Sequence, residues 1–491
     1  MPSVSNRRQF LARTARVAAS ALGYAFACPR FSSAASPDLD PAAVRRLASR
    51  LHGRVIVPAD RAYDAARRVN YWNPRTDRRP ALIARCQSAE DIARAVEFGQ
   101  ANELSVAVRG GGHSYLGWGT CDRGLLIDVA EMRRCSIDPA KRTGVAEGGV
   151  LTADFVAAAS RYGLAPVSGE CPSVGIAGLT LGGGLGWLSG KYGAACDHVL
   201  SARLVTGSSR VIRTNASRDA ELFWAIRGGG GNFGIVTAFE FRLHPVRDVI
   251  AGTFSYRFED ARAVLRFFRE FMAEAPDEFQ ADLMVVARAS VEATVFYAGD
   301  LAGGERLLQP WRAIATPRRD TAKVMAYTDL HTMPPASPSD ASNRTMFKGV
   351  NGVYIQRLSD DVIDIILARL DQAPEGAAIG LAHYMHGAVC RVPPEDTAFE
   401  LRAADAVHLN IRTTWQDPAA ADSCMAWGDD TARLLRPFSV GRMYANFQSV
   451  EGPDSGRQVF GRNHPRLIAI KKAYDPANFF RRNPNVSSRP E

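Results

Sequence analysis

The stretch SGECPSVGIAGLTLGGGLGWLSGKYG, residues 168–193, consists mainly of small residues and contains one cysteine, Cys171. Two further glycine-rich stretches are RGGGHS at residues 109–114, which contains His113, and GGGGNFG at residues 228–234. Clustered glycines let the backbone approach a ligand closely, and consecutive N–H groups can converge on one anion. A single such loop is most simply a connection between strands. Three of them predict a ligand with a pyrophosphate and a flat ring system, in contact with His113 and Cys171.

Strands and helices alternate around these stretches. The predicted strands lie at residues 81–87, 104–108, 125–129, 200–206 and 234–243, and the predicted helices at residues 88–103 and 152–163. Ser88, with Asp91 three residues later, is typical of a helix N-terminus. The alternation predicts an α/β domain that ends near residue 248.

The third stretch contains the pattern G-x-G-x-x-G at Gly229, Gly231 and Gly234. A dinucleotide-binding loop with this pattern is followed directly by a helix. Here the next residues are IVTAFEFRL, whose β-branched and aromatic side chains predict a strand. The context therefore excludes a Rossmann loop, and the chain also lacks the GxxxxGK[ST] phosphate-loop pattern.

The character of the sequence changes after Pro245. Strands are predicted within residues 282–300, 350–358, 378–389 and 406–415, and helices at residues 260–275 and 361–372. Residues 317–345 are rich in Pro, Ser, Asp and Thr and predict a long loop. Strands separated by a few helices indicate an antiparallel sheet with helices on one face. The predicted fold class is α+β: an α/β domain followed by a domain with an antiparallel sheet covered by helices.

The N-terminus resembles a twin-arginine export signal. Arg7 and Arg8 precede a short apolar run that ends in an A-x-A-like sequence at Ala25 and Ala27. Residues 1–37 are therefore predicted to be an export signal and leader, read by the export machinery, and the protein is predicted to be periplasmic or secreted. A basic amphipathic helix is the alternative, and Cys28 leaves lipid attachment open. No apolar run is long enough for an integral membrane span.

Charge and cysteine content argue against two classes of function. The formal net charge is +9, but five arginines precede the first acidic residue, Asp38, and no basic stripe is interleaved with aromatic residues. Nucleic-acid binding is therefore not expected. The eight cysteines include no C-x-x-C pair, so a structural zinc site is not expected either. One or two disulfides in an oxidising compartment stay open.

Several long motifs resemble the berberine bridge enzyme-like oxidases, part of the vanillyl-alcohol oxidase superfamily of FAD-linked oxidases. They are RGGGHSYLG from residue 109, SGECPSVGIAGLTLGGGLGWLSGKYGAACDHVLSARLVT from residue 168, ELFWAIRGGGGNFGIVTAFEF from residue 221, and YANFQ with FGRNHPRLIAIKKAYDPANFFRRNPNV near the C-terminus. The resemblance implies a PCMH-type FAD-binding domain at residues 45–248, a substrate-binding domain at residues 249–443, and a C-terminal segment at residues 444–491 that returns to the FAD-binding domain.

The same resemblance implies a bicovalent FAD. In the family, the histidine of the first loop bonds to the flavin 8α-methyl carbon and the cysteine of the second loop bonds to flavin C6; His113 and Cys171 occupy these positions. An inert buried thiol is the alternative for an isolated cysteine. Further FAD contacts are implied for Arg109, Gly110, Gly111, Gly112, Ser114, Gly175, Gly178, Gly231, Val236, Tyr444 and Asn446.

Residues 407–415, VHLNIRTTW, alternate between an apolar face and a polar face, and the polar face is predicted to line the substrate cavity. Asn410 stands where family members often have an acidic residue, a tyrosine or a glutamine, and an amide cannot abstract a proton. Tyr444 occupies the other family position with acid–base chemistry, as a catalytic base or as a substrate hydrogen-bond donor. His383 and His386 are predicted as cavity or core histidines, and Tyr115 is a further candidate.

The sequence thus predicts an exported FAD-dependent oxidase. A hydride from an alcohol, a sugar or an aromatic or alkaloid-like substrate passes to flavin N5, and the electrons then pass to oxygen, giving hydrogen peroxide. The predicted partners are a small-molecule substrate and oxygen. A flavin dehydrogenase with another acceptor is one alternative, and a flavin-carrying binding protein without turnover, suggested by Asn410, is the other. The fold does not decide the substrate.

Overall fold

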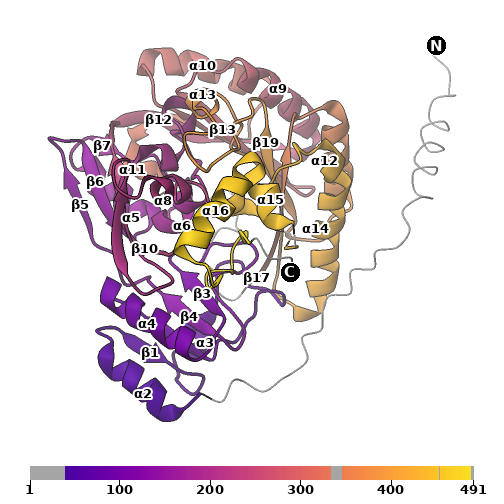
Figure 1. Ribbon diagram of the computed structural model, residues 1–491. Coiled ribbons are helices and arrows are strands. Elements are labelled where there is room, and N and C mark those ends of the chain that lie inside the picture. Colours follow the sequence, from indigo (N-terminus) through magenta and orange to yellow (C-terminus); the bar gives the residue numbers. More distant parts are fainter. Residues whose placement is uncertain (1–38, 333–345, 450, 453, 488–491) are drawn as a thin grey trace. The chain divides into compact units, whose positions relative to one another are not determined.

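The computed structural model describes residues 39–332, 346–449, 451–452 and 454–487 (Figure 1). Its first sheet has the strand order β1-β2-β4-β3. These strands are β1 (Arg54–Ile56), β2 (Leu82–Arg85), β3 (Val106–Arg109) and β4 (Leu125–Asp128), and two short helices, α2 (Pro41–Arg50) and α3 (Tyr63–Arg67), precede β2. β2, β4 and β3 run parallel, whereas β1 pairs antiparallel with β2.

The connection from β2 to β3 is helix α4 (Ala89–Ala101). The Ser88 hydroxyl accepts the backbone N–H of Asp91 at 3.1 Å, which confirms the predicted N-cap. β3 ends at Arg109, so the RGGGHS loop leaves the carboxyl end of a parallel strand. That edge is where open α/β sheets bind their ligands.

The second sheet is antiparallel, with the order β5-β6-β10-β8-β9. Its strands are β5 (Cys135–Asp138), β6 (Thr143–Glu147), β8 (Val199–Val205), β9 (Val211–Asn215) and β10 (Ile235–Arg242). Helices α5 (Thr152–Ser160) and α8 (Ala220–Ala225) connect strands of this sheet. Short helices α6 (Ile176–Leu181) and α7 (Ser189–Tyr192) lie within the 168–193 stretch, and η1 (Ala195–His198) follows it before β8. β10 follows GGGGNFG directly, which confirms that this loop is not a Rossmann loop.

The third sheet has the order β15-β12-β14-β13-β18-β19-β17, and β16 also pairs with β12. All of its pairings are antiparallel. The strands are β12 (Asp248–Arg257), β13 (Phe279–Val286), β14 (Ser290–Tyr297), β15 (Arg319–Asp320), β16 (Lys323–Ala326), β17 (Phe347–Ile355), β18 (Ala378–Ala382) and β19 (Val407–Trp415). The predicted hairpin within residues 282–300 is the β13–β14 pair.

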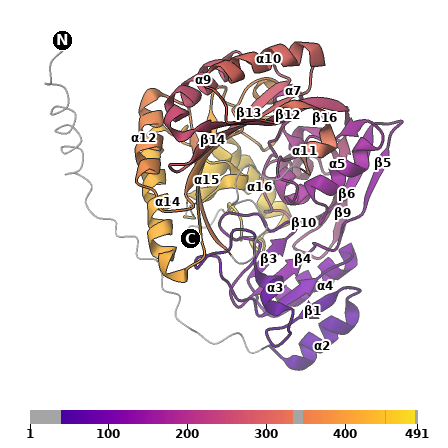
Figure 2. The same ribbon diagram turned by 180° about the vertical axis from the view of Figure 1, so that it is seen from behind.

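Helices cover one face of the third sheet, as predicted (Figure 2). They are α9 (Ala261–Ala273), α10 (Leu301–Ala313), α12 (Asp360–Asp371) and α14 (Ala421–Leu435). Phe268 of α9, Trp311 of α10 and Ile366 of α12 are fully buried against sheet residues such as Phe254 and Leu409. Burial of such large apolar side chains holds the helices to the sheet and leaves the opposite face of the sheet for the cavity described below.

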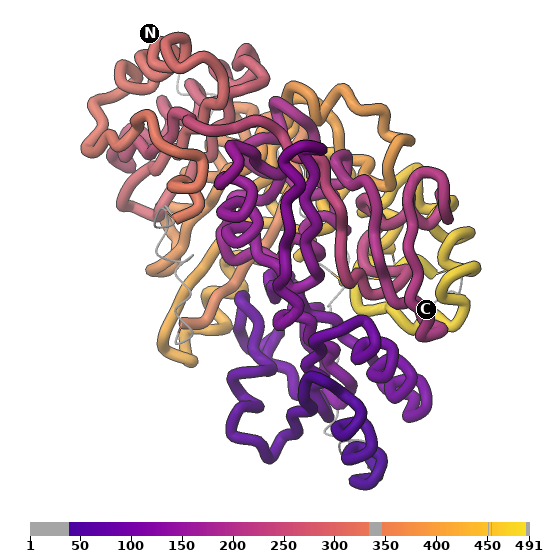
Figure 3. The backbone as a smooth tube through the Cα atoms, turned by 90° about the vertical axis from the view of Figure 1, so that its left-hand side faces the viewer, coloured from indigo at the N-terminus to yellow at the C-terminus, as the bar shows by residue number. Residues whose placement is uncertain are grey.

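The C-terminal segment packs against the second sheet. Helices α15 (Ser455–Phe460) and α16 (His464–Tyr474) contribute Phe460, Leu467 and Ile470 to a core shared with β10 and α8. Figure 3 shows this segment, in yellow, beside the strands of the second sheet, in magenta. The chain therefore returns, after the third sheet, to elements formed some 200 residues earlier.

The predicted loop at residues 317–345 is wrong for the part that the structure describes. Residues 319–326 contain β15 and β16, and α11 (Tyr327–Leu330) follows. Both strands pair with the edge of β12, so tertiary pairing outweighs the loop-like composition. Residues 333–345 lie outside the described residues.

The predicted export signal, the leader and Cys28 also lie outside the described residues. Within the described part of the chain, no helix is long and apolar enough to cross a membrane. The cysteines in that part all carry free thiols, including Cys171, so none of them forms a disulfide there.

Candidate active site

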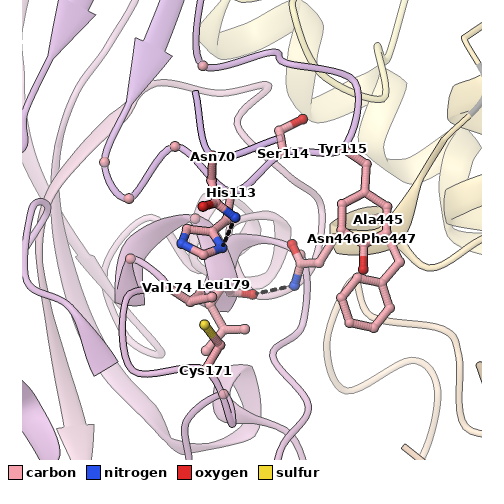
Figure 4. Close-up of a pocket in the computed structure, with 18 of the residues that line it drawn as sticks. Asn70, His113, Ser114, Tyr115, Cys171, Val174, Leu179, Ala445, Asn446 and Phe447 are labelled. Atoms are coloured by element: carbon pink, nitrogen blue, oxygen red, sulfur yellow. Dashed lines mark hydrogen bonds between the residues drawn. The ribbon is translucent and has the colours of Figure 1, made fainter. Parts of the chain in front are cut away.

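A cavity of about 700 Å³ lies between the glycine-rich stretches and the third sheet (Figure 4). Loop residues 109–115, 169–175, 230–231 and 234–236 supply one part of its wall. Side chains from β12, β13, β14, β18 and β19 supply another part. The three stretches that the sequence predicts to share a ligand therefore converge on one space.

His113 and Cys171 lie on the same wall of this cavity (Figure 4). The Ser173 hydroxyl lies 3.0 Å from His113 Nε2 and 3.4 Å from Cys171 Sγ. On the other edge of the imidazole, Nδ1 lies 3.4 Å from Asn70 Nδ2. Both side chains are partly exposed to the cavity. The two nucleophiles, about sixty residues apart in sequence, thus flank a single hydroxyl group.

Glycine is required where two of the loops touch. A Cβ at Gly111 would lie 2.3 Å from the backbone nitrogen of Gly175, and a Cβ at Gly175 would lie 2.5 Å from that of Gly111. At Gly178 no described atom lies within 4 Å of an added Cβ, and at Gly231 the nearest is Asn483 Nδ2 at 3.9 Å. The first two glycines therefore let two loops pack together, whereas Gly178 and Gly231 border open space in the cavity.

The remaining predicted loop residues also line the cavity: Gly110, Gly112, Ser114 and Val236. The side chain of Arg109 is engaged elsewhere, because its Nη2 donates to the Asp128 carboxylate at 2.7 Å and its Nη1 donates to the Arg68 carbonyl at 3.2 Å. Arg109 therefore fixes the end of β3 with its guanidinium group.

A second guanidinium group, Arg482, lies at the cavity and was missed by the sequence analysis. Among the described residues, neither its Nε nor its Nη2 has a hydrogen-bond partner, and both atoms are buried. Asn483 Oδ1 is buried and without a partner in the same way. Unsatisfied buried polar atoms are costly, so this corner suits a ligand with anionic and hydrogen-bonding groups. The sequence feature that could have pointed to Arg482 is the polar run RRNPN, which follows the last helix.

Tyr444 does not lie on the cavity wall, although Ala445, Asn446 and Phe447 do. Its hydroxyl oxygen accepts the backbone N–H groups of Gly184 at 3.2 Å and Leu185 at 3.1 Å, and the side-chain amide of Asn446 at 2.9 Å. Burial raises the pKa of Tyr444 to about 12. The Tyr444 hydroxyl therefore fixes the turn at residues 184–185, and its role as catalytic base stays a prediction.

Asn410 lines the cavity together with Arg412, as predicted for the polar face of this strand, whereas His408 is buried next to Phe447. The Tyr115 hydroxyl donates to Asn410 Oδ1 at 2.6 Å. The Tyr115 ring stacks on Phe447 with ring centroids 5.2 Å apart. Asn410 therefore holds an aromatic wall of the cavity in place.

Three ionisable side chains, Glu170, Asp282 and His383, meet at the cavity, whereas the sequence analysis had named only His383. His383 Nδ1 lies 3.0 Å from Glu170 Oε1, and the His383 backbone N–H donates to Asp282 Oδ1 at 3.1 Å. The candidate ligand atoms of the three residues all lie within 4.8 Å of one another. His386 instead bonds to Gln280 Oε1 at 3.1 Å and is a core histidine. The sequence analysis missed Glu170 and Asp282. The only signals in the sequence were that Glu170 is next to Cys171 and that Asp282 lies on a predicted strand.

Comparison with known proteins identifies the family. The family model described as "FAD binding domain" matches residues 80–215, and the model described as "Berberine and berberine like" matches residues 443–487. The (R)-6-hydroxynicotine oxidase of Paenarthrobacter nicotinovorans is 32% identical over 454 residues, which cover 89% of this chain and 97% of that protein. The chain belongs to the berberine bridge enzyme-like family of FAD-linked oxidoreductases.

Solved structures of this berberine bridge enzyme-like family share the fold. The 6-hydroxy-D-nicotine oxidase of Arthrobacter nicotinovorans superposes with a TM-score of 0.79 at 29% identity, covering 90% of this chain and 98% of the other. Physcomitrella patens BBE-like 1 superposes with a TM-score of 0.81 at 24% identity, over the same shares of the two chains. The α+β architecture expected from the sequence is therefore confirmed.

The cavity of this berberine bridge enzyme-like protein fits FAD. Open space next to Gly178 and Gly231 lets a flat ring system or a diphosphate approach the backbone. The buried guanidinium group of Arg482 would supply a positive charge for a diphosphate. His113 and Cys171 present a nitrogen and a sulfur to the same space.

Proposed function

We propose that this enzyme holds FAD bicovalently, through His113 at the flavin 8α-methyl carbon and Cys171 at flavin C6. The observation that carries the proposal is the placement of both side chains around the Ser173 hydroxyl on one cavity wall. The backbone of the three glycine-rich loops and the side chains of Arg482 and Asn446 complete the FAD-binding site. When bound, FAD supplies a hydride acceptor and an electron carrier to oxygen.

The proposed domain limits follow the family pattern. Residues 45–248 bind FAD, residues 249–443 bind the substrate, and residues 444–491 return to the FAD-binding part. The contacts of α15 and α16 with β10 support this assignment. Residues 1–37 are proposed as a twin-arginine export signal, on the sequence alone, which places the enzyme in the periplasm or outside the cell.

The proposed reaction is oxidation of a small molecule at a carbon that bears a hydroxyl or amino group. A hydride leaves that carbon, a base takes the proton from the heteroatom, and molecular oxygen takes up the two electrons as hydrogen peroxide. The substrate classes are alcohols, sugars and aromatic or alkaloid-like compounds, and the similarity to a hydroxynicotine oxidase supports the last of these.

The test is whether flavin stays with the acid-precipitated protein. We expect the unmutated protein and His113→Ala to precipitate yellow, the latter through Cys171 alone, and the double variant with Cys171→Ala to release its flavin. A colourless precipitate from the unmutated protein contradicts bicovalent attachment.

Oxygen use is tested separately at Val174, which lines the cavity three residues after Cys171. Val174→Ile narrows access at this position, so we expect slower reoxidation of the reduced enzyme in stopped-flow measurements. Negligible peroxide from the unmutated protein favours a dehydrogenase with another electron acceptor. Equal reoxidation rates in both proteins remove Val174 from the oxygen path.

A further inference from the structure

The cavity face of the third sheet is divided by charge. Asp282 and Met284 on β13 pair with Thr294 and Glu292 on β14, so two carboxylates lie at this side of the face. Beyond β13, the small residues of β18 separate it from Asn410 and Arg412 on β19. A substrate in the cavity therefore meets acidic groups at one end and an amide and a guanidinium group at the other.

The two sheet carboxylates have different surroundings. Glu292 accepts the Ser255 hydroxyl at 2.7 Å and forms an ion pair with Arg319 at 3.3 Å, so its charge is compensated. Asp282 instead shares its surroundings with Glu170 and His383. Glu170 projects from the loop that carries Cys171, so this acidic cluster stands next to the proposed flavin attachment site.

Proton occupancy in the cluster follows from burial. Burial, with the nearby charge of Glu170, raises the pKa of Asp282 well above its usual range. Burial lowers the pKa of His383. Asp282 therefore favours its protonated form beside the charge of Glu170, and His383 favours its neutral form.

Further titratable side chains that face the cluster are those of His331, His408 and Tyr327. Burial lowers the pKa of His331, after α11, to about 4, and lowers the pKa of His408 on β19 well below its usual range. Burial raises the pKa of Tyr327 on α11. All three side chains are therefore neutral near pH 7. Arg412, the cation on the cavity face, lies on β19, with β18 between it and β13.

We propose that Glu170, Asp282 and His383 form a substrate site that selects a basic amine and accepts its ammonium proton. The inference rests on the proposed flavoenzyme function and names its substrate class. It also assigns a proton-accepting role to a residue other than Tyr444, since the amide of Asn410 cannot take up a proton.

The proton transfer balances within the cluster. The ammonium group of the substrate approaches the Glu170 carboxylate, its N–H bond breaks, and an O–H bond forms on Glu170. The electron pair of the broken bond stays on the amine nitrogen, which becomes neutral and able to stabilise loss of a hydride from the adjacent carbon. The two carboxyl groups are then both protonated, and His383 holds them in place through its backbone and its ring.

A binding experiment on the flavin-loaded enzyme tests the selection step without turnover. The probes are 2-phenylpropan-2-amine and 2-phenylpropan-2-ol, which have nearly the same shape and carry no hydrogen on the carbon attached to nitrogen or oxygen. Neither can donate a hydride from that carbon. Isothermal calorimetry near pH 7 should give a dissociation constant at least about tenfold lower for the protonated amine than for the alcohol, because hydrogen bonds to a charged group are the stronger ones.

Two near-isosteric variants separate the roles of the carboxyl groups. Glu170→Gln removes the charge, so amine affinity should fall at least about tenfold and match that of the alcohol. Asp282→Asn keeps an N–H donor where the protonated carboxyl group was, so amine affinity should fall less than in Glu170→Gln. The control is Glu97→Gln on the surface of α4, which should change neither. The infrared carbonyl band of a protonated carboxyl group should be absent from Asp282→Asn.

Equal affinities of the unmutated protein for the amine and the alcohol overturn the proposal, even if Glu170→Gln fails to fold. So does one equivalent of a bound divalent cation that is lost in Glu170→Gln, because the cluster is then a metal site. These outcomes differ from failure of the proposed function, in which the protein carries no covalent flavin at all.

Discussion

The two sides of the cavity are built in different ways. The side formed by the glycine-rich loops is rich in glycine and holds two reactive side chains, His113 and Cys171, around one hydroxyl. The side formed by the third sheet consists of side chains from five strands, among them Asp282, Glu292, Asn410 and Arg412. A side chain at Gly111 or Gly175 on the first side would meet backbone of the neighbouring loop, whereas the second side can change its chemistry one side chain at a time. The first side suits a fixed cofactor, and the second suits a substrate that differs among relatives.

The largest expected effect is on the loop side. In Gly111→Ala the new Cβ would lie 2.3 Å from the backbone nitrogen of Gly175, so one loop must move. We expect a loss of about 3 kcal/mol or more in the free energy of unfolding, at or above the upper end for overpacking, and loss of bound flavin.

Gly178→Ala should fold with unchanged stability because no described atom lies within 4 Å of its Cβ, but should retain less flavin because that Cβ enters the ligand space. Gly452→Ala, at an exposed site with the same open surroundings, is the control. Thermal unfolding and flavin absorbance measure both effects. A Gly111→Ala protein with normal flavin content contradicts the backbone account of this side.

The next effect concerns the neutral histidines behind the substrate side. Burial lowers the pKa of His331 from 6.5 to about 4. Unfolded chains bind a proton here below pH 6.5 and the folded protein does not, so stability falls as the pH drops from about 6.5 to about 4. The contribution amounts to about 3 kcal/mol. In His331→Phe, denaturant unfolding at pH 7 and pH 4 should show a smaller difference than in the unmutated protein; an equal difference contradicts the assignment.

A smaller effect is expected at Tyr444. Tyr444→Phe leaves the N–H groups of Gly184 and Leu185 without their acceptor, which costs about 1–3 kcal/mol of stability. Flavin reduction by a good substrate should change less than about tenfold, because the hydroxyl does not reach the cavity. Stopped-flow reduction and thermal unfolding give the two numbers. A fall of about 10²-fold or more, the usual cost of losing a general base, supports the catalytic interpretation.

The contrast between the two sides also governs what the sequence could predict. The loops at residues 109–114 and 168–193 could be recognised from the sequence, because a cluster of glycines indicates that the backbone there approaches another group closely. The polar face of β19 was recognisable from strand alternation, and Asn410 and Arg412 do line the cavity.

Glu170, Asp282 and Arg482 could not be found in that way. Glu170 comes from a loop, Asp282 from the middle of β13, and Arg482 from the C-terminal segment, so only the tertiary fold brings them to one cavity. The hydrogen bonds of Tyr444 could not be predicted for a related reason, since its burial and its three N–H donors are properties of its surroundings. The strands within residues 319–326 depend on pairing with β12.

Peptide mapping by mass spectrometry tests most directly whether one flavin is held by both loops. Trypsin should release the His113-containing peptide, residues 110–123, and the Cys171-containing peptide, residues 162–191. The account predicts a single species that contains both peptides joined through one FAD, and a species with the second peptide alone in His113→Ala. Recovery of both peptides at their unmodified masses from the yellow, unmutated protein would contradict it.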